Sequence, residues 1–297
     1  MHREDQGDYM ANKTSFQLVK KVLDELRAEI ITVTGTDAGA DDAIAKEVKR
    51  LSACYLNLTD PAMPPIDYSH AITRCAYIYS TVVANSDFVY QALRESGDLV
   101  ASVLLTSERP IVTCIGGGPG SELIGLLRYV FDSNAKPKSL TCYLCDREQA
   151  WADSWTDLGQ ELDGQWPLFV NFQQLDVLNA STWTKQRKFL SADLFIASYF
   201  ASEIMRMGNA SLPFWHEFFA SAKKDALLLV VDFDHVSTES YVASITSTLG
   251  WIQIYSKSGR RTLSGFEQKG DLGELLGKFD RSPRTQGSVI VKLFRKT

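Results

Sequence analysis

The feature that most constrains this chain is the texture of its last two thirds, where short apolar runs alternate with amphipathic segments. The apolar runs are predicted as strands, and they lie at 111–115, 140–145, 168–172, 193–199, 226–232, 251–255 and 288–294. Helices are predicted between them, near 121–131, 147–159, 201–222 and 237–248. Strands without polar alternation that are separated by helices indicate a mainly parallel sheet covered on both faces. We therefore predict an α/β fold.

The first hundred residues have a different pattern, which predicts helices. Apolar residues recur every three or four positions between Phe16 and Ile30, which places one apolar stripe on a helix. Further helices are predicted near 43–55 and 68–95, on either side of the proline-containing loop PAMPP at 61–65. We expect residues 1–104 to form a helical cap or lid and residues 105–297 to form the sheet domain. Within the latter, the polar, glycine-rich stretch 256–287 is predicted as a long loop with a short helix.

Composition excludes several classes of protein. The longest apolar runs are far shorter than the roughly 20 residues that cross a bilayer, and no apolar h-region follows the polar N-terminus. We expect a protein of the cytosol or nucleus that is neither secreted nor associated with a membrane. The net charge of −5 gives no general attraction to phosphate backbones. Lys257, Arg260 and Arg261 form the only tight basic cluster.

The five cysteines, without an export signal, favour reduced thiols. Only Cys142 and Cys145 form a CxxC pair, and both lie in a predicted strand. Residues three apart on a strand point to opposite faces. We therefore predict neither a disulfide nor a metal site from this pair.

The stretch IVTCIGGGPGSE, Ile111 to Glu122, predicts a tight strand–turn–helix corner. Glycine lacks Cβ, so the backbone can turn sharply and a ligand can approach it closely. Such corners lie at the carboxyl ends of strands, where open parallel sheets bind ligands. The dinucleotide fingerprint fails because Ser121 occupies its last small-residue position, and no GK[ST] of a P-loop follows. A GxGxG frame of Gly116, Gly118 and Gly120 remains, which favours a nucleoside without pyrophosphate; a crowded turn is the alternative.

Acidic residues follow the next two predicted strands. Asp146 ends the second, and a carboxylate there can accept hydrogen bonds from both hydroxyls of a ribose. Asp176 and Val177 follow the third, where an acid could bind an adenine amine while the apolar neighbour packs on the ring. Helix capping is the alternative for Asp146. Three such features in chain order, each directly after a strand, predict a nucleoside site.

These motifs resemble a known family. IVTCIGGGPGSE, YLCDRE, LDVLN, ADLFIASYFASEI and LLLVVDFDH resemble, in order, the motifs of the class I methyltransferases that use S-adenosylmethionine (SAM), over residues 105 to 297. The resemblance implies a Rossmann-like sheet of seven strands in the order 3-2-1-4-5-7-6, with the last strand antiparallel. It also implies SAM as cofactor and S-adenosyl-L-homocysteine (SAH) as product. The wording GGGPGSE, with YSHAITRCAYIY before it, is also similar to a branch that includes fungal rRNA uridine methyltransferases.

The resemblance assigns roles to residues of the motifs. Gly116, Gly118 and Gly120 would border the methionine moiety, Asp146 would hold the ribose, and Asp176 with Val177 would flank the adenine. Neighbouring motif residues are further candidates for cofactor contacts: Gly117, Glu122, Arg147 and Ser198. From the cap, Arg74 could pair with the cofactor's carboxylate in bidentate geometry, with Tyr79 beside it. Core packing or a surface ion pair are the alternatives for these two.

Methyl transfer needs mainly alignment of the two reactants, and a base only where the nucleophile must lose a proton. After the fourth strand this chain has Ser198-Tyr199-Phe200 in place of the [ND]PP[YF] motif of many enzymes that methylate amines of nucleobases or glutamine. This departure counts against those subclasses. Tyr199 and Glu203 are candidates for facing the substrate, with core packing and helix capping as the alternatives. His235, after the fifth strand, is a candidate proton acceptor.

Three functions stay open at this point. The first is a SAM-dependent methyltransferase acting on a small molecule, in a pocket between the Rossmann-like domain and the N-terminal helices. The acidic net charge and the aromatic residues of the cap favour it. The alternatives are an rRNA or other RNA base methyltransferase and a non-catalytic methyltransferase-like binding protein. The intact glycine corner and both acids argue against the last.

Overall fold

A computed structural model describes residues 13–57, 65–159, 166–247 and 250–297. Seven strands form one sheet in the order β3-β2-β1-β4-β5-β7-β6. β1 to β5 are parallel, and β7 runs antiparallel to both β5 and β6. The predicted α/β fold and strand order are confirmed. The strands are β1 (Ile111–Ile115), β2 (Leu140–Asp146), β3 (Leu168–Gln174), β4 (Leu194–Ser198), β5 (Leu227–Phe233), β6 (Trp251–Thr262) and β7 (Gln286–Lys296).

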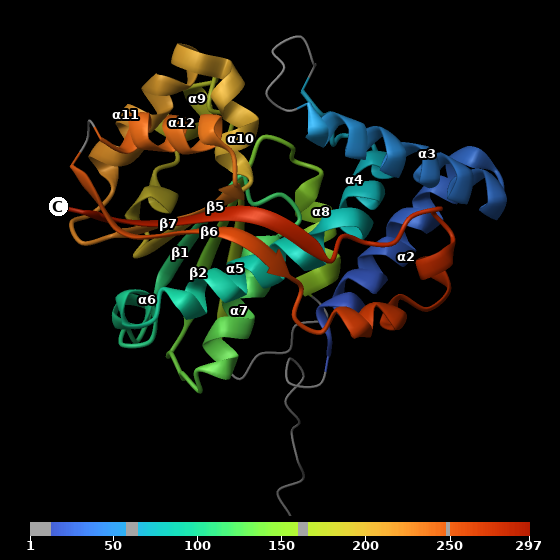
Figure 1. Cartoon of the computed structure of the whole chain (residues 1–297), viewed down its shortest axis with the longest axis horizontal. Helices are drawn as coiled ribbons and strands as arrows, with labels where there is room; N and C mark the ends of the chain where they lie inside the picture. Colours follow the sequence, from blue (N-terminus) through green and yellow to red (C-terminus); the bar gives the residue numbers. More distant parts are fainter. Residues whose placement is uncertain (1–12, 58–64, 160–165, 248–249) are drawn as a thin grey trace, which may run out of the picture.

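Helices cover both faces of the sheet and extend beyond one end of it (Figure 1). One face carries α5 (Val83–Glu95), α7 (Ser121–Asp132) and α8 (Trp151–Gly159), and the other carries α9 (Ser181–Thr184), α11 (Leu212–Ser221) and α12 (Val236–Thr246). The remaining helical elements are α2 (Ser15–Thr34), α3 (Asp37–Leu56), α4 (Ala71–Tyr77), η1 (Ile78–Val82), α6 (Asp98–Leu104), η2 (Lys188–Ser191), α10 (Phe200–Ile204), η3 (Met205–Ser211) and η4 (Phe266–Gly277).

Alternate residues of the strands feed two separate apolar cores. Cys142 belongs to the core under α5 and α7, whereas Cys145 belongs to the core under α11 and α12. Both thiols are buried and free. The prediction that the CxxC pair points to opposite faces is confirmed, and it follows from the two-residue period of a strand.

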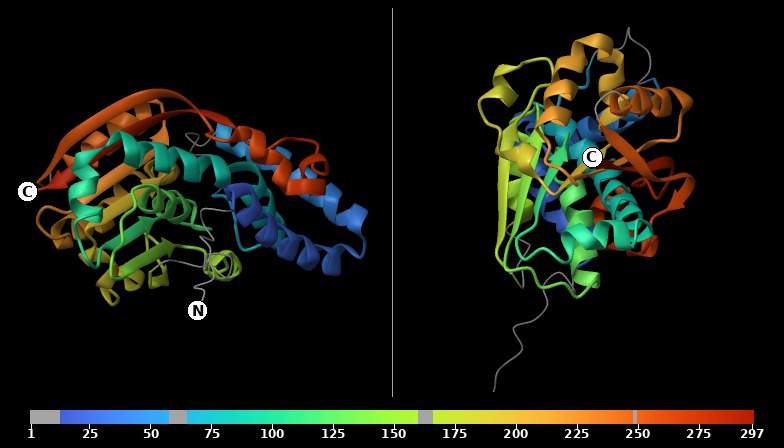
Figure 2. Two further views of the ribbon diagram at one scale, coloured as in Figure 1. Left: turned by 90° about the horizontal axis from the view of Figure 1, so that it is seen from below. Right: turned by 90° about the vertical axis from the view of Figure 1, so that its left-hand side faces the viewer.

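The N-terminal helices form a lobe beyond the carboxyl ends of the strands. α2 begins with a capping box between Thr14 and Gln17 and ends at Gly35, whose φ of 78° suits a residue without Cβ. α2, α3 and α4 pack together, and η4, from the connection between β6 and β7, packs against α2 (Figure 2). α5, in contrast, lies along the sheet on α7. No helix among the described residues is long and apolar enough to span a membrane.

One glycine of α7 allows α5 to pack closely against that helix. A methyl group on Gly125 of α7 would lie 2.3 Å from the carbonyl oxygen of Ser86 and 3.1 Å from the amide nitrogen of Tyr90, both on α5. Only a residue without Cβ allows this approach. The contact fixes the segment that leaves the N-terminal lobe relative to the helix that follows the glycine corner.

Three predictions about elements need correction. β6 continues to Thr262 and pairs with β7 along its length, so 256–262 is strand and not loop. The helix predicted over 201–222 is broken into α10, η3 and α11, with Gly208 at φ 51° inside the break. The long helix after residue 68 begins at Ala71 and contains the π-helical turn η1, an irregularity that often occurs at functional sites. Most of the predicted PAMPP loop lies outside the described residues.

Candidate active site

A cavity of about 100 Å³ lies at the carboxyl ends of β1 to β4, and we call it the strand-end cavity. It lies where the order of an open α/β sheet reverses, between β1 and β4, which is the place such sheets bind ligands. Its lining includes residues predicted from sequence together with residues of the N-terminal segment: Pro65, Ile66, Tyr68, Tyr77, Gly116, Asp146, Arg147, Glu148, Leu175, Asp176, Val177, Ser198, Tyr199, Phe200, Glu203, Ile204, Arg206 and Met207.

The glycine corner closes one side of this cavity. Gly116, Gly118 and Gly120 all have positive φ, at 68°, 38° and 88°, a region that other residues rarely adopt. A methyl group on Gly116 would lie 2.4 Å from Cδ2 of Phe200. Gly117 is part of the same turn and donates its amide to the carbonyl oxygen of Cys145 (3.0 Å). The glycines therefore form the predicted tight turn, of which Gly116 alone lines the cavity.

Asp146 connects the glycine corner to the end of β2. Its two carboxylate oxygens accept hydrogen bonds from the amides of Gly118 and Glu148, each at 2.9 Å. Burial raises its pKa to about 6, although both hydrogen bonds oppose the rise. Each oxygen retains capacity for a further hydrogen bond, so the carboxylate can serve both the turn and a ligand's hydroxyl groups.

The other predicted cofactor residues at this cavity have free capacity as well. Asp176 uses one oxygen to accept from the amide of Leu178 (2.9 Å), and the adjacent Val177 is buried. The Oγ of Ser198 is buried and has no hydrogen-bond partner among the residues that the structure describes. An unpaired buried hydroxyl costs free energy unless a ligand pairs it. Arg147 also lines the cavity, and its Nη2 lies 3.4 Å from the carbonyl oxygen of Ile66.

A second cavity, of about 250 Å³, lies between the sheet and the N-terminal helices, and we call it the helix-side cavity. It shares Tyr77, Tyr199 and Glu203 with the strand-end cavity, so the two have a common wall. Its lining residues come from α3, α4, η1, α5, α10, the end of β5 and the segment before β7. They are Val48, Leu51, Ser52, Tyr55, Tyr77, Ser80, Thr81, Asn85, Tyr199, Glu203, Phe233, Arg281, Ser282 and Arg284.

Glu203, on α10, stands in the common wall without a partner. Its carboxylate makes no hydrogen bond or ion pair with any residue that the structure describes. Burial raises its pKa to about 8, and the nearby charges of Asp146 and Asp232 add to the rise. A partnerless carboxyl group with a pKa near neutrality, at the junction of two cavities, is suited to exchange a proton with a bound molecule.

Tyr199 forms the rest of the wall in a strained conformation. Its φ is 55°, in the left-handed region that a bulky residue rarely adopts. The ring packs edge-on against Phe233 with centroids 4.7 Å apart, and its hydroxyl accepts a hydrogen bond from Nη2 of Arg284 (2.9 Å). Strain of this kind is typical of residues whose position serves a site.

Besides the other three glycines of the corner, four residues predicted at the site line neither cavity. Arg74 donates to the carbonyl oxygens of Tyr68 (3.1 Å) and Ser69 (2.6 Å), so its guanidinium holds the chain entering α4. The hydroxyl of Tyr79 donates to the carbonyl oxygen of Arg281 at 2.7 Å.

The other two of these residues, Glu122 and His235, lie in α7 and directly before α12. Glu122 is buried in α7, where burial raises its pKa to about 8 and Ser121 donates to it. His235 caps α12 by accepting from the amide of Ser237 through Nδ1 (3.3 Å). The structure thus gives all four residues structural contacts of their own.

Sequence reasoning missed Tyr55, Asn85 and Arg284. They come from α3, α5 and the segment before β7, and the hydrogen bond from Arg284 to Asn85 joins residues 199 positions apart. No local motif marks such a pair. Tyr68 and Tyr77, from the predicted cap, line the strand-end cavity.

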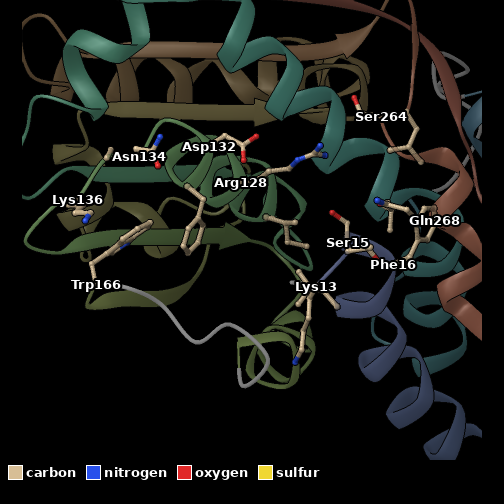
Figure 3. Close-up of a pocket in the computed structure, with 17 residues that line it drawn as sticks. Lys13, Ser15, Phe16, Arg128, Asp132, Asn134, Lys136, Trp166, Ser264 and Gln268 are labelled. Atoms are coloured by element: carbon tan, nitrogen blue, oxygen red, sulfur yellow. The ribbon is translucent and has the colours of Figure 1, made fainter. Parts of the chain in front are cut away.

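A larger cavity lies elsewhere, beside α7. Its volume is about 480 Å³, and it shares no lining residue with the other two. Figure 3 shows Arg128 and Asp132 of α7 in it, with the start of α2 at one end and Trp166 at the other. Two of its charged groups are already paired: Arg128 with Asp87 (2.8 Å), and Asp132 with the hydroxyl of Tyr90 (2.5 Å).

Comparison with known proteins finds similar folds at low sequence identity. No protein-family model matches the sequence, and no curated protein matches it. A proposed class I SAM-dependent methyltransferase from Listeria monocytogenes is 12% identical, covers 95% of this chain and 88% of its own, and has a TM-score of 0.49. A proposed RNA methyltransferase from Pyrococcus horikoshii is 14% identical over 72% and 84% of the two chains, with a TM-score of 0.42.

A proposed sarcosine dimethylglycine methyltransferase from Galdieria sulphuraria is 11% identical over 76% and 88% of the chains, with a TM-score of 0.42. The closer likeness to fungal rRNA uridine methyltransferases stays a prediction. The strand order of the sheet, with its antiparallel β7, is the one that the sequence motifs imply. The chain therefore has the class I SAM-dependent methyltransferase fold.

Proposed function

We propose that this protein is a SAM-dependent methyltransferase whose cofactor binds in the strand-end cavity and whose small-molecule acceptor binds in the helix-side cavity. One observation carries the proposal: the two cavities meet at Tyr77, Tyr199 and Glu203. Methyl transfer requires a donor and an acceptor in line at close range, and two adjoining cavities offer that arrangement.

The residues of the strand-end cavity fit the parts of SAM. Asp146 would accept from the ribose hydroxyls, Asp176 and Val177 would flank the adenine, and Ser198 would give its unpaired hydroxyl a partner. The cavity is smaller than the roughly 300 Å³ at which ligand pockets begin. Binding therefore requires flexible side chains of its border, such as Met207 and Arg147, to move.

Bound SAM would supply a methyl group already activated on a sulfonium and would leave as SAH. Glu203 would accept the proton that the acceptor's nucleophile loses, because it faces both cavities and has no hydrogen-bond partner among the described residues. A positive charge in the strand-end cavity would lower the pKa of Glu203 from about 8 and favour the carboxylate that acts as base. Tyr77 and Tyr199 would exclude water from the junction.

The position of the helix-side cavity, under α3 and α4, supports a small acceptor over RNA. The basic cluster that RNA would need is partly engaged within the chain, because Glu95 pairs with both Lys257 (3.2 Å) and Arg261 (2.6 Å). The intact glycine corner and the partnerless Glu203 support catalysis over a non-catalytic binding role.

Isothermal titration with SAM and with SAH tests the cofactor assignment. We expect both to bind and to raise the melting temperature, by mass action on the folded state. No heat and no thermal shift with either ligand would show that the proposal is wrong. Incubation with methyl-labelled SAM and fractionated cell extract tests the acceptor, with label expected among small molecules. Label in the RNA or protein fraction would show that the acceptor is not a small molecule and would leave the cofactor assignment unaffected.

A further inference from the structure

Arg284 brings into the helix-side cavity a positive charge that no described residue balances. Its Nη2 donates to the hydroxyl of Tyr199 (2.9 Å) and to Oδ1 of Asn85, and both partners are neutral. Among the described residues Nε has no hydrogen-bond partner, and it is closed off from solvent. Nη1 donates to no residue in the described part of the chain. The guanidinium therefore retains Nη1 and its charge for a ligand.

Three arginines in the described part of the chain whose side chains are largely withdrawn from solvent have acidic partners. Arg27 pairs with Asp41 at 2.6 Å, Arg261 with Glu95 at 2.6 Å, and Arg74 with Glu29 at the longer distance of 3.9 Å. Withdrawing an unpaired charge from water costs free energy unless another group compensates it. Within the described residues Arg284 lacks that compensation, and it lines a cavity large enough for a small molecule.

The guanidinium is also fixed in place before any ligand arrives. It lies over the rings of Tyr199 and Phe88, at 4.9 and 5.4 Å from their centroids. Its backbone amide donates to the carbonyl oxygen of Ser80 (2.9 Å), and Tyr79 anchors the same segment through Arg281. An immobilised guanidinium whose Nη1 is free can donate a charge-assisted hydrogen bond to one oxygen of a carboxylate.

We propose that the methyl acceptor is a small carboxylic acid whose carboxylate binds Arg284 and whose hydroxyl or amine lies at Glu203. This inference rests on the proposed function. The two charged residues line one cavity of about 250 Å³ without pairing with each other, and the rings of Tyr55, Tyr77 and Phe233 lie among its walls. A single unpaired guanidinium balances one negative charge, which favours a monocarboxylate over a phosphate monoester.

The chemistry balances with the groups named. The acceptor's oxygen or nitrogen gains the methyl group, its proton passes to the carboxylate of Glu203, and the electron pair of the broken methyl–sulfur bond stays on sulfur. Arg284 does not take part in the transfer. It orients the acceptor by holding the end remote from the nucleophile.

The test compares small hydroxy- and amino-monocarboxylates, aliphatic and aromatic, with their neutral amides, such as 4-hydroxybenzoate with 4-hydroxybenzamide. Binding is measured by titration with and without saturating SAH. We expect at least one acid to bind about tenfold or more tightly than its amide, because the amide leaves Arg284 unpaired. Equal binding of every pair, no binding by any acid, or tighter binding of a matched phosphate ester would overturn the proposal.

Variants locate the charge that is responsible. Arg284→Met should abolish the preference for the acid, and Arg284→Lys should keep a reduced preference because the charge stays while the planar fork is lost. Arg281→Met is the matched control, since Arg281 lines the same cavity but is exposed, and it should keep the full preference. A preference lost in Arg281→Met and kept in Arg284→Met would contradict the assignment. If Arg284→Met does not fold, the comparison of acid with amide in the wild type still tests whether the cavity prefers a carboxylate.

Arg284 could instead bind the carboxylate of the cofactor, and one further measurement separates the two roles. Methylthioadenosine has the nucleoside of SAH without its carboxylate. If Arg284→Met weakens SAH about tenfold and leaves methylthioadenosine unaffected, the arginine serves the cofactor and the inference is wrong. If wild-type protein binds no SAH, the proposed function is wrong. The comparison of acids with amides in the absence of SAH still tests whether Arg284 binds a carboxylate.

Discussion

The strand-end cavity and the helix-side cavity share a wall, yet they are built in different ways. The first takes its polar groups from turns that directly follow strands, where hydrogen bonds between neighbouring strands fix their positions. The second depends on helices and a connecting segment that dock onto the sheet, so Asn85 must meet Arg284 across 199 positions of sequence. A cavity of the first kind keeps its shape while the sheet exists. One of the second kind also depends on how the N-terminal lobe is seated.

The largest effect is expected at the wall itself. Glu203→Gln removes the proton acceptor while keeping the shape, so transfer of labelled methyl groups to extract metabolites should fall about a hundredfold or more, the usual range for a general base. SAM affinity should change little. Activity of the wild type should rise with pH as the group, whose pKa is about 8 in the free protein, ionises. Retained activity with an unchanged pH profile would exclude Glu203 as the base.

Gly125→Ala should lower the stability of the protein and should weaken ligand binding in the helix-side cavity more than in the strand-end cavity. A methyl group 2.3 Å from the carbonyl oxygen of Ser86 must push α5 away from α7, which should cost about 1 to 3 kcal/mol of unfolding free energy. Because α5 carries Asn85, binding in the helix-side cavity should weaken more than SAM binding. Denaturant unfolding and titration measure both. Gly270→Ala is the control, since nothing lies within 4 Å of its added methyl group; equal losses in the two variants would refute the packing argument.

Asp146→Ala should affect the strand-end cavity alone. We expect SAM to bind about tenfold more weakly, because the loss exceeds one neutral hydrogen bond of about 1 kcal/mol and also frees the amide of Gly118. Titration measures the change, with the melting temperature as a check on folding. Asp234→Ala provides a matched control, since that exposed carboxylate lies outside both cavities and accepts only from Ser288. Unchanged SAM affinity would show that Asp146 does not hold the ribose.

The smallest effect concerns stability and pH. The pKa of Glu203 is raised by burial, so the folded state keeps its proton up to about pH 8 while the unfolded chain loses it near pH 4.5. Stability should therefore fall as pH rises between these values. Glu203→Gln should remove part of this loss and be more stable than the wild type at pH 8, by on the order of 1 kcal/mol, with no difference near pH 4. Parallel melting curves across the range would argue against the raised pKa.

The same contrast explains what the sequence could predict. Strands β1, β4 and β5 are buried and have continuous apolar sequences, and the glycine corner and its acids are adjacent to strands in sequence. β6 was predicted too short because it is an edge strand with most of its side chains exposed, so Ser256 to Thr262 lack an apolar pattern. Arg284 could not be predicted as a site residue, because its role follows from the lack of an acidic partner around it among the described residues. Which side chains surround a residue is known only from the folded structure.

The connection between β6 and β7 has a consequence for how such a protein could change over evolutionary time. It leaves the sheet after Thr262 and returns at Gln286, and the strands that bound it are paired in register with each other. Lengthening a loop between two fixed ends costs little. The segment that carries Arg284 could thus be replaced, and with it the choice of acceptor, while the residues from Gly116 to Gly120 stay as they are. A new acceptor specificity would then arise in this connection without a change in the glycine corner.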